Sequence, residues 1–438
     1  MNRTTRIAAG AAAFALLVAG CGGGDDGGGG DVAEPGSLEG ETIEVAAVWT
    51  GAEQEALEAV LAGFTEQTGA EVTFTSTGDD IATVLGTRIA GGDPPDVAIL
   101  PQPGLLNQFV EDGSLQPLSE EVSAAVDENF SAVWKDLGSV DGELYGVWFK
   151  AANKSTVWYN TGVFSDAGAE VPADLEGFVE TAQTIADSGV TPVSVAGGDG
   201  WTLTDWFENV YLRVAGPDMY DQLTAHEIPW TDPSVITALE TLAEMWGNGD
   251  LVAGGGSGAQ QVLFPDSVEA VFSDEPEAAI VYEGDFVAGV IADSTNAVVG
   301  EDADWFPFPS IEGSEESVVG GGDVAVALTD SEAAMTLLEY LATAEAAEIW
   351  AEIGGYISPN TNVDTGVYPD DTTRAIAEAL VGAGDNFRFD MSDQMPPAFG
   401  GTPGQGEWAI LQDFLADPTS VDATAAALEA AAAEAYDA

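Results

Sequence analysis

Residues 42–100 read TIEVAAVWTGAEQEALEAVLAGFTEQTGAEVTFTSTGDDIATVLGTRIAGGDPPDVAIL. Short apolar or alternating runs, which are typical of buried strands, alternate here with segments whose apolar residues recur at helical spacing. The expected elements are strands at 42–48, 71–75 and 96–100 and helices at 56–68 and 80–90. This β-α-β-α-β order with short loops predicts parallel strands joined by right-handed crossovers.

The same α/β pattern recurs along the chain, and the C-terminal third is mostly helical. Further strands are expected at 145–150, 155–159, 191–195, 278–282 and 324–328, and helices at 175–188, 204–214, 233–246, 332–352 and 421–436. The body after residue 41 has about 400 residues, which is more than one hydrophobic core usually supports. We therefore expect an α/β protein of two domains.

The N-terminus has the order of a secretory signal. Arg3 and Arg6 precede an apolar run over 7–19 that is too short to span a membrane, and Gly20 precedes Cys21, the single cysteine. A small residue before such a cysteine resembles the lipobox of bacterial lipoproteins, so residues 1–20 are a predicted signal peptide and Cys21 a predicted lipidation site. The alternative is an ordinary signal peptide with an incidental cysteine. Residues 21–41, rich in Gly and Asp, predict a flexible tether that holds an extracytoplasmic body at the cell membrane.

The charge balance is strongly acidic, with 9 Lys plus Arg against 76 Asp plus Glu and a net charge of −67. Such a surface repels nucleic acid and anionic lipid, so the lipid anchor is the expected membrane contact and no nucleic-acid partner is expected. The acids are spread along the chain, which favours the solvated surface of a halophilic protein; acidic drift in another habitat is the alternative. A single cysteine excludes an internal disulfide, and no later segment is apolar enough to span a membrane.

Several short motifs resemble, in the family's order, family 1 extracellular solute-binding proteins, the sugar receptors of ABC importers. They are Val48-Trp49-Thr50-Gly51-Ala52-Glu53, Phe64-Thr65-Glu66-Gln67-Thr68-Gly69, Gly91-Gly92-Asp93-Pro94-Pro95-Asp96-Val97, Leu100-Pro101-Gln102-Pro103-Gly104, Val147-Trp148-Phe149-Lys150, Ser155-Thr156-Val157-Trp158-Tyr159-Asn160, the segment 199–209, Gly320-Gly321-Gly322-Asp323, Gly354-Gly355-Tyr356-Ile357-Ser358-Pro359-Asn360 and Arg388-Phe389-Asp390. The alpha-glucoside-binding members are the most similar. Each motif alone is weak, but together they cover the chain from residue 42 onward.

The resemblance implies the two-lobed, type II fold of periplasmic binding proteins, with a sugar bound in a hinged cleft. Lobe 1 would comprise 42–148 plus 306–329 and lobe 2 would comprise 152–303 plus 332–438. By likeness to the maltose-binding members, the chain would cross between lobes near 150–154, 305–311 and 327–331. The implied function is capture of a carbohydrate, such as an oligosaccharide or alpha-glucoside, by a monomer that delivers it to an ABC permease. The alternatives are a carbohydrate-active enzyme and a receptor for a non-sugar polar solute.

Aromatic residues at loop and strand ends are candidate plates for the faces of a sugar ring. Trp49 lies where a strand turns into a helix, a usual ligand position in α/β sheets, although it could instead cap the core. Trp201 is expected in a loop and Trp206 in the following helix, where a core position is equally plausible. The resemblance adds Trp148 and Phe286, and Tyr356, which follows Gly354-Gly355, is a candidate second plate.

Charged residues near these aromatics are candidate partners for sugar hydroxyls. Lys150 and Lys154 fall together at the presumed hinge of a chain that has few cations, which suggests a positional role. The carboxylates are Glu53, Asp205, Glu283, Asp285 and Asp323, of which Asp323 could instead cap a turn. Arg388 is added by the resemblance.

Enzyme and cofactor chemistry has little support in the sequence. Among so many acids, paired carboxylates prove nothing, and the resemblance points away from a glycosidase. His226 is the single histidine, so zinc, copper and iron lack their usual ligands. No glycine-rich phosphate motif is present. We therefore expect no cofactor and no metal, and ATP hydrolysis by a separate partner.

The acidic surface predicts that salt stabilises the fold. Unfolding separates mutually repelling charges, and molar salt shortens the Debye length to about 3 Å. The melting temperature should therefore rise between low and molar NaCl in a thermal scan. A flat or falling profile would contradict the halophilic interpretation.

Overall fold

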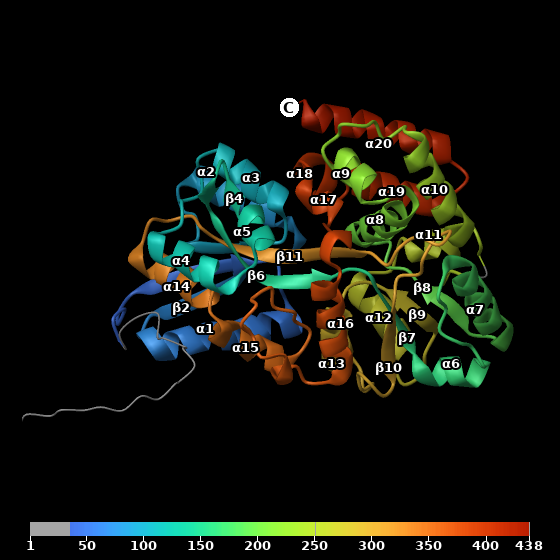
Figure 1. The fold of residues 1–438 in the computed structure, drawn as a ribbon, viewed down its shortest axis with the longest axis horizontal. Coiled ribbons are helices and arrows are strands. Elements are labelled where there is room, and N and C mark those ends of the chain that lie inside the picture. The colour runs from blue at the N-terminus through green and yellow to red at the C-terminus, as the bar shows by residue number, and fades with distance from the viewer. Residues whose placement is uncertain (1–35, 250, 438) are drawn as a thin grey trace, which may run out of the picture. The chain divides into compact units, whose positions relative to one another are not determined.

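The computed structural model describes residues 36–249 and 251–437, which form α/β layers around two large sheets (Figure 1). The first sheet has the order β12-β11-β3-β1-β2, with β6 paired to β11. Its strands are β1 (Thr42–Ala47), β2 (Glu71–Ser76), β3 (Val97–Leu100), β6 (Gly146–Asn153), β11 (Val318–Ala327) and β12 (Phe387–Phe389). Strand β1 runs parallel to β2 and β3, whereas β11 runs antiparallel to β3 and β6. The predicted parallel β-α-β-α-β unit is thereby confirmed.

Helices cover both faces of this sheet because residues on β1 alternate between two cores. Ile43 and Val45 face one core, and Ala46 faces the other. Helix α1 buries Leu57, Phe64 and their neighbours on the first face and ends at Gly69, whose φ of 78° lies in the left-handed region. The helices of this half are α1 (Gly51–Thr68), α2 (Ile81–Gly91), α3 (Pro103–Glu111), α4 (Glu120–Asn129), α5 (Ala132–Leu137), α14 (Glu332–Leu341) and α15 (Ala344–Ile353).

The second sheet has the order β10-β7-β9-β8. Its strands are β7 (Thr156–Asn160), β8 (Thr191–Ser194), β9 (Ala278–Tyr282) and β10 (Ala303–Pro307). Its helices are α6 (Thr161–Ala167), α7 (Leu175–Ser188), α8 (Trp201–Ala215), α9 (Pro217–Thr224), α10 (Pro233–Trp246), α11 (Gly255–Ala259), α12 (Phe264–Phe272), α13 (Val287–Ser294), α19 (Gly406–Ala416) and α20 (Val421–Tyr436). The core that faces α1 continues onto α12 and α13 of this half.

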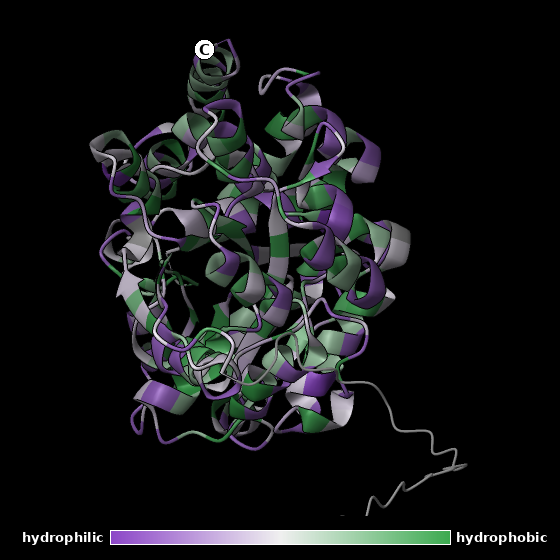
Figure 2. Ribbon diagram, turned by 90° about the vertical axis from the view of Figure 1, so that its left-hand side faces the viewer, coloured by the Kyte–Doolittle hydropathy of each residue, from purple (hydrophilic) through white to green (hydrophobic). Residues whose placement is uncertain are grey.

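Shorter elements complete the chain. They are β4 (Ser139–Val140), β5 (Glu143–Leu144), α16 (Asp371–Gly382), α17 (Met391–Gln394), α18 (Pro397–Gly400) and 3₁₀ turns at 78–80, 365–367 and 384–386. In Figure 2 the hydrophilic stretches lie mainly on peripheral helices and loops, as expected when apolar residues fill the cores. Across the part of the chain that is described, no helix is long and apolar enough to cross a membrane.

The long strands β6 and β11 connect the two sheets and lie side by side in Figure 1. Strand β6 continues through Lys154 and Ser155 into β7, and β10 leads through 308–317 into β11. The chain then stays with the first sheet, because α14 and α15 pack against α1, α4 and β1, and it reaches the second half through β12 and α17. The sequence analysis instead assigned residues from 332 onward to the second lobe.

A buried polar network fixes α8 to these connections. Arg213 is 5% exposed, and its guanidinium group donates to the carbonyl oxygens of Phe308 at 3.2 Å and Ser317 at 2.8 Å. Asn209, one turn earlier, accepts from Ser155 Oγ at 2.6 Å, and Ser155 Oγ accepts from Val319 N at 2.9 Å. Buried polar groups that satisfy one another in this way are costly to separate. Helix α8 is therefore held in a defined position relative to both connecting segments.

Candidate functional site

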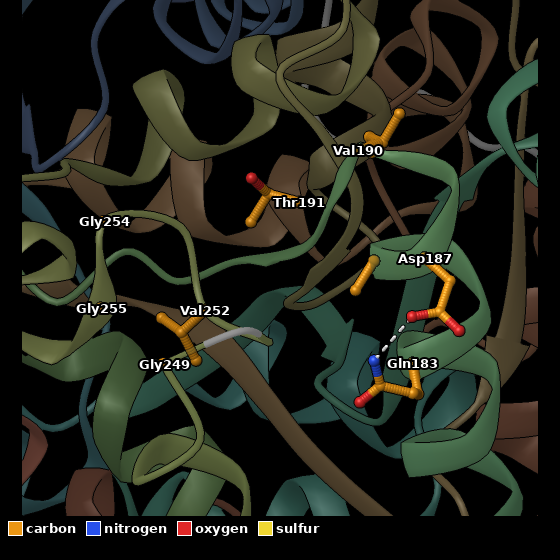
Figure 3. A pocket seen from close by; sticks show the side chains of 10 residues that line it. Gln183, Asp187, Val190, Thr191, Gly249, Val252, Gly254 and Gly255 are labelled. Carbon is orange, nitrogen blue, oxygen red and sulfur yellow. Dashed lines mark hydrogen bonds between the residues drawn. The ribbon is translucent and has the colours of Figure 1, made fainter.

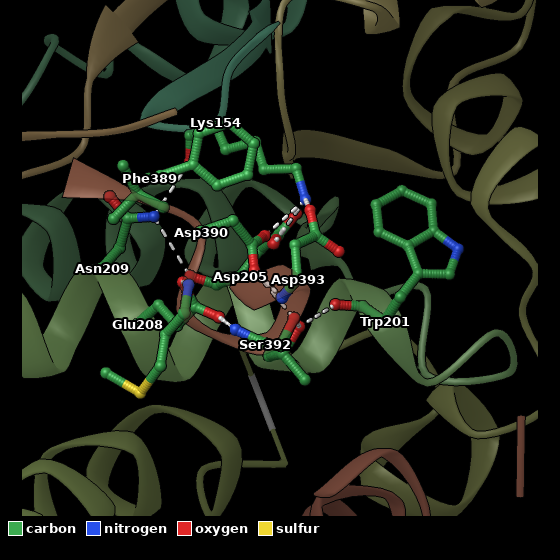
Figure 4. Close-up of polar contacts among 12 residues, drawn as sticks. Lys154, Trp201, Asp205, Glu208, Asn209, Phe389, Asp390, Ser392 and Asp393 are labelled. Carbon is green, nitrogen blue, oxygen red and sulfur yellow. Dashed lines mark hydrogen bonds and ion pairs between the residues drawn. The ribbon is translucent and has the colours of Figure 1, made fainter. Parts of the chain in front are cut away.

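Lys154 lies at the centre of a cluster of carboxylates (Figure 4). Its ammonium Nζ lies 3.2 Å from Asp205 Oδ1, 2.5 Å from Asp390 Oδ2 and 3.5 Å from Asp393 Oδ2. The Nζ atom also lies 5.9 Å from the centroid of the Trp201 ring. Burial lowers the pKa of Lys154, but the charges of Asp205 and Asp390 outweigh that effect and hold it well above its usual value. The lysine therefore stays charged.

Helix α8 supplies Trp201, Asp205 and Glu208, which recur at the spacing of one helical face. The structure begins this helix at Trp201, whereas the sequence analysis expected that residue in a loop. Gly200 makes the turn before it with a φ of 89°, a conformation that glycine adopts without strain. The early helix start is what directs Trp201 and Asp205 toward Lys154.

Glu208 positions the segment that carries Asp390 and Asp393. Its carboxylate accepts from Met391 N at 2.6 Å and Ser392 N at 2.9 Å, and also from the Tyr220 hydroxyl. Asp390 in turn accepts from Asp393 N at 2.9 Å. Burial raises the pKa of Asp390, but the Lys154 charge outweighs this and holds it well below its usual value. Asp390 is therefore the firmly ionised partner of Lys154.

Lys150, which lies in β6 shortly before Lys154, is the centre of a second group of contacts. Its Nζ atom pairs with Glu53 and lies 5.3 Å from the ring centroids of both Trp49 and Trp350. A β-bulge between Asp323 and Val324 of β11 sets Asp323 directly opposite Lys150 on β6. Burial lowers the pKa of Lys150, but Glu53 and Asp323 outweigh it and leave it raised.

Asp323 lies between the two lysine groups. Its backbone faces Lys150, and its carboxyl group feels the charges of Lys150, Glu53 and Lys154. Burial raises the pKa of Asp323 to about 7. Burial likewise raises the pKa of Asp285 to about 6 and that of Asp393 to about 8. Several of these carboxyl groups can therefore donate as well as accept hydrogen bonds near neutral pH.

Glu283 and Asp285 follow β9 and are almost fully buried, at 1% and 2% exposure. Asp285 Oδ1 accepts from Asn153 N at 2.6 Å, at the end of β6. Burial raises the pKa of the Glu283 carboxyl well above its usual value, and the neighbouring Asp205 raises it further.

Three partly buried aromatic rings lie beside Lys154. The centroid of Trp201 is 5.4 Å from that of Phe264 and 5.9 Å from that of Phe286, and the latter two are 5.4 Å apart. All three contacts are edge-to-face, which leaves ring faces for other partners. The structure thus brings Trp201 and Phe286 together.

Other candidates from the sequence lie in the cores or apart from the lysines. Trp148 packs against Trp134 and Phe389, and Trp206 packs against Tyr282. Tyr356 is fully buried, with its ring stacked on Trp350 and its hydroxyl donating to Phe149 O. Arg388 Nε pairs with Asp221 at 2.6 Å. Trp49 is 4% exposed against the edge of Trp350 but stays beside Lys150.

Sequence reasoning did not select Asp390, Asp393, Glu208, Phe264 or Trp350 as site residues. Asp390 stood in one of the family motifs, and Glu208 followed Asp205 at helical spacing. Asp393, Phe264 and Trp350 carried no comparable signal, because their role depends on segments far apart in the chain.

A surface hollow of about 630 Å³ lies elsewhere, lined by Gln183, Asp187, Thr191, Gly249, Val252 and their neighbours (Figure 3). None of the predicted site residues lines it. Within residues 36–249 and 251–437, no group of three or more His, Cys, Asp or Glu side chains is arranged to hold a metal ion.

The family profile of the bacterial extracellular solute-binding proteins matches residues 49–348. This match covers more than half of the chain, and the chain belongs to this family. The resemblance stated from the motifs is thereby confirmed, and the protein is a solute-binding protein with the two-lobed, type II α/β fold.

Relatives and solved structures agree with this assignment. The osmoprotective compounds-binding protein GgtB of Synechocystis sp. is 38% identical over 88% of this chain and 92% of its own length. The alpha-glucosides-binding periplasmic protein AglE of Rhizobium meliloti is 34% identical over 89% of this chain and 86% of its own. The solute receptor AcbH, described as preferring β-D-galactopyranose, has the same fold, with a TM-score of 0.78 at 23% identity over 90% of this chain and 99% of its own.

The buried carboxyl groups predict a stability that falls as pH rises. The folded state holds protons on Asp285, Asp323 and Asp393 that the unfolded chain releases above about pH 4. Their stabilisation is complete below that pH and is lost as pH rises through about 6 to 8. Urea midpoints measured between pH 5 and 9 should decrease.

A matched pair of variants tests the source of this slope. Asp323→Asn removes the carboxyl group and should flatten the profile, whereas Asp112→Asn changes an exposed residue and should leave it unchanged. A midpoint that rises steadily from pH 5 to 9 would contradict the expectation.

Proposed function

We propose that this protein is the extracytoplasmic receptor of an ABC importer and captures a neutral, hydroxyl-rich solute of the alpha-glucoside class. The observation that carries the proposal is the group of Trp201, Phe286 and Phe264 beside Lys154 and its carboxylates. A sugar offers C–H faces to aromatic rings and hydroxyls to charged groups. Trp201, Asp393 and Asp323 would then contact the ligand, and Lys150 with Glu53 would extend the site.

The relatives support this ligand class. AglE is named for alpha-glucosides and is 34% identical to this chain over most of its length. Proteins of the same fold include a chitin oligosaccharide binding protein, with a TM-score of 0.77, and the maltose-bound MalE3 of T. maritima, with a TM-score of 0.69. Binding without turnover, by a monomer that delivers its ligand to a permease, follows from the same family role.

A second candidate ligand class is an osmoprotective compound. GgtB carries that description and is 38% identical to this chain. The net charge of −67 independently suggests life in salty surroundings, where such solutes are taken up. The two classes overlap where the osmoprotectant is itself a glucoside.

We also propose that the ligand lies between two lobes that close on it. Lobe 1 would hold the first sheet with α14 and α15, which pack on α1, and lobe 2 would hold the second sheet. Both lysines lie at or next to the connecting strand β6, and Asp205 and Glu53 come from opposite halves. Such an arrangement supports hinge closure.

A ligand screen tests the proposal directly. Maltose, trehalose and sucrose should raise the melting temperature, and glycine betaine tests a non-sugar osmoprotectant. Isothermal titration should then give one site per chain, with the sugar recovered intact. Stabilisation by glycine betaine alone would move the assignment to a non-sugar receptor, and steady appearance of shorter sugars would indicate an enzyme.

Trp201→Ala should weaken binding of the sugar found in that screen by roughly 1–3 kcal/mol, or about one to two powers of ten in Kd. The unbound fold should remain nearly as stable, because this ring is only partly buried. Trp201→Phe keeps a stacking ring and should retain most of the affinity. Unchanged affinity with a large loss of stability would return Trp201 to the core.

The membrane anchor is a separate proposal that rests on Cys21, which lies outside the described residues. Cys21→Ser should move the protein from the membrane fraction to the soluble fraction or block signal removal. Gly28→Ser in the same tether serves as the control and should leave the distribution unchanged. Membrane retention of a fully processed Cys21→Ser protein would contradict lipidation.

A further inference from the structure

In the part of the chain that the structure describes, the lysine and arginine side chains are all engaged by other groups of the protein. Over residues 36–249 and 251–437 the ion pairs are Arg88 with Glu44, Lys135 with Asp127, Lys150 with Glu53, Lys154 with Asp205, Asp390 and Asp393, Arg374 with Asp371 and Arg388 with Asp221. Arg213 is buried and donates to backbone carbonyls and to Asn209. A negatively charged ligand would therefore have to displace an existing carboxylate to reach a cation.

At the proposed site Lys150 lies behind its partner. Lys150 is 4% exposed at the side chain, whereas Glu53 is 36% exposed. Lys154 is 13% exposed and is held by Asp205 and Asp390, which are fully buried. An incoming solute would meet the carboxyl group of Glu53 before it met the Lys150 ammonium group.

Glu53 is the most exposed of the carboxyl groups that pair with the two lysines. A hydroxyl group can donate to a carboxylate, whereas a carboxylate or phosphate on a ligand can only repel it. The local arrangement thus favours hydroxyl donors over anions, independently of the net charge of the whole surface.

We propose that Glu53 determines the charge class of the ligand by masking Lys150, so that the site takes uncharged glycosides and rejects carboxylate- or phosphate-bearing ones. This inference rests on the proposed function, because it concerns the same site. It predicts a change of specificity when the mask is removed. Glu53→Gln keeps the shape of the side chain but leaves Lys150 less neutralised.

The test compares methyl α-D-glucopyranoside with its 6-carboxylate, methyl α-D-glucopyranosiduronate, by isothermal titration in 0.1 M and 1 M NaCl. At 1 M the Debye length is about 3 Å, so repulsion by the distant surface is screened and contact-range charges remain. The unmodified protein should bind the neutral glycoside at least about tenfold more tightly at both salt concentrations. Glu53→Gln should reduce that preference about tenfold, chiefly by binding the uronide more tightly.

Asp127→Asn is the matched control, because it makes the same charge change beside Lys135, which pairs with Asp127 away from the site. It should leave the preference unchanged. Equal binding of both glycosides by the unmodified protein at 1 M NaCl would overturn the inference, as would an unchanged preference in Glu53→Gln. Binding of neither glycoside would instead contradict the proposed alpha-glucoside class. Glu53→Asp is a second variant that keeps the negative charge and should retain the preference.

Discussion

The ion cluster around Lys154 is the interaction on which the arrangement of this protein depends. A buried ammonium group is costly unless carboxylates and hydrogen bonds compensate it, and here Asp205, Asp390 and Asp393 do so. These acids come from α8 and from the segment after β12, while the lysine follows the connecting strand β6. One buried charge therefore ties together the first sheet, the second sheet and the connection between them.

The cost of burying a charge also explains how the carboxyl groups in the interior are compensated. In a chain with 76 acidic and 9 basic residues, most buried carboxyl groups have no cation to pair with. They are compensated instead by backbone N–H groups, as in Glu208, or by keeping a proton, as burial favours for Glu283 and Glu407. Carboxyl groups that keep a proton can both donate and accept hydrogen bonds.

The local elements were largely predictable, because each is encoded by a periodic pattern of apolar residues. The β-α-β-α-β unit at 42–100 and helices such as 175–188 and 233–246 occur where that periodicity places them. The predicted start of α8, at residue 204, was wrong, because Gly200 allows a turn that brings Trp201 into the helix. The assignment of 332–353 to the second lobe differs from the observed packing on α1, which depends on contacts between distant segments.

For the site, the sequence by itself determined the family, the α/β class and the significance of two lysines in a chain with few cations. It also selected Trp201, Phe286, Asp205 and Glu53. Only the tertiary structure separated these from Trp148, Trp206 and Tyr356, which pack in cores, and added Asp390 and Asp393. The physical reason is that periodicity reports which face of an element is buried, whereas pairing of a charge with acids from α8 and α17 depends on how separate elements pack together.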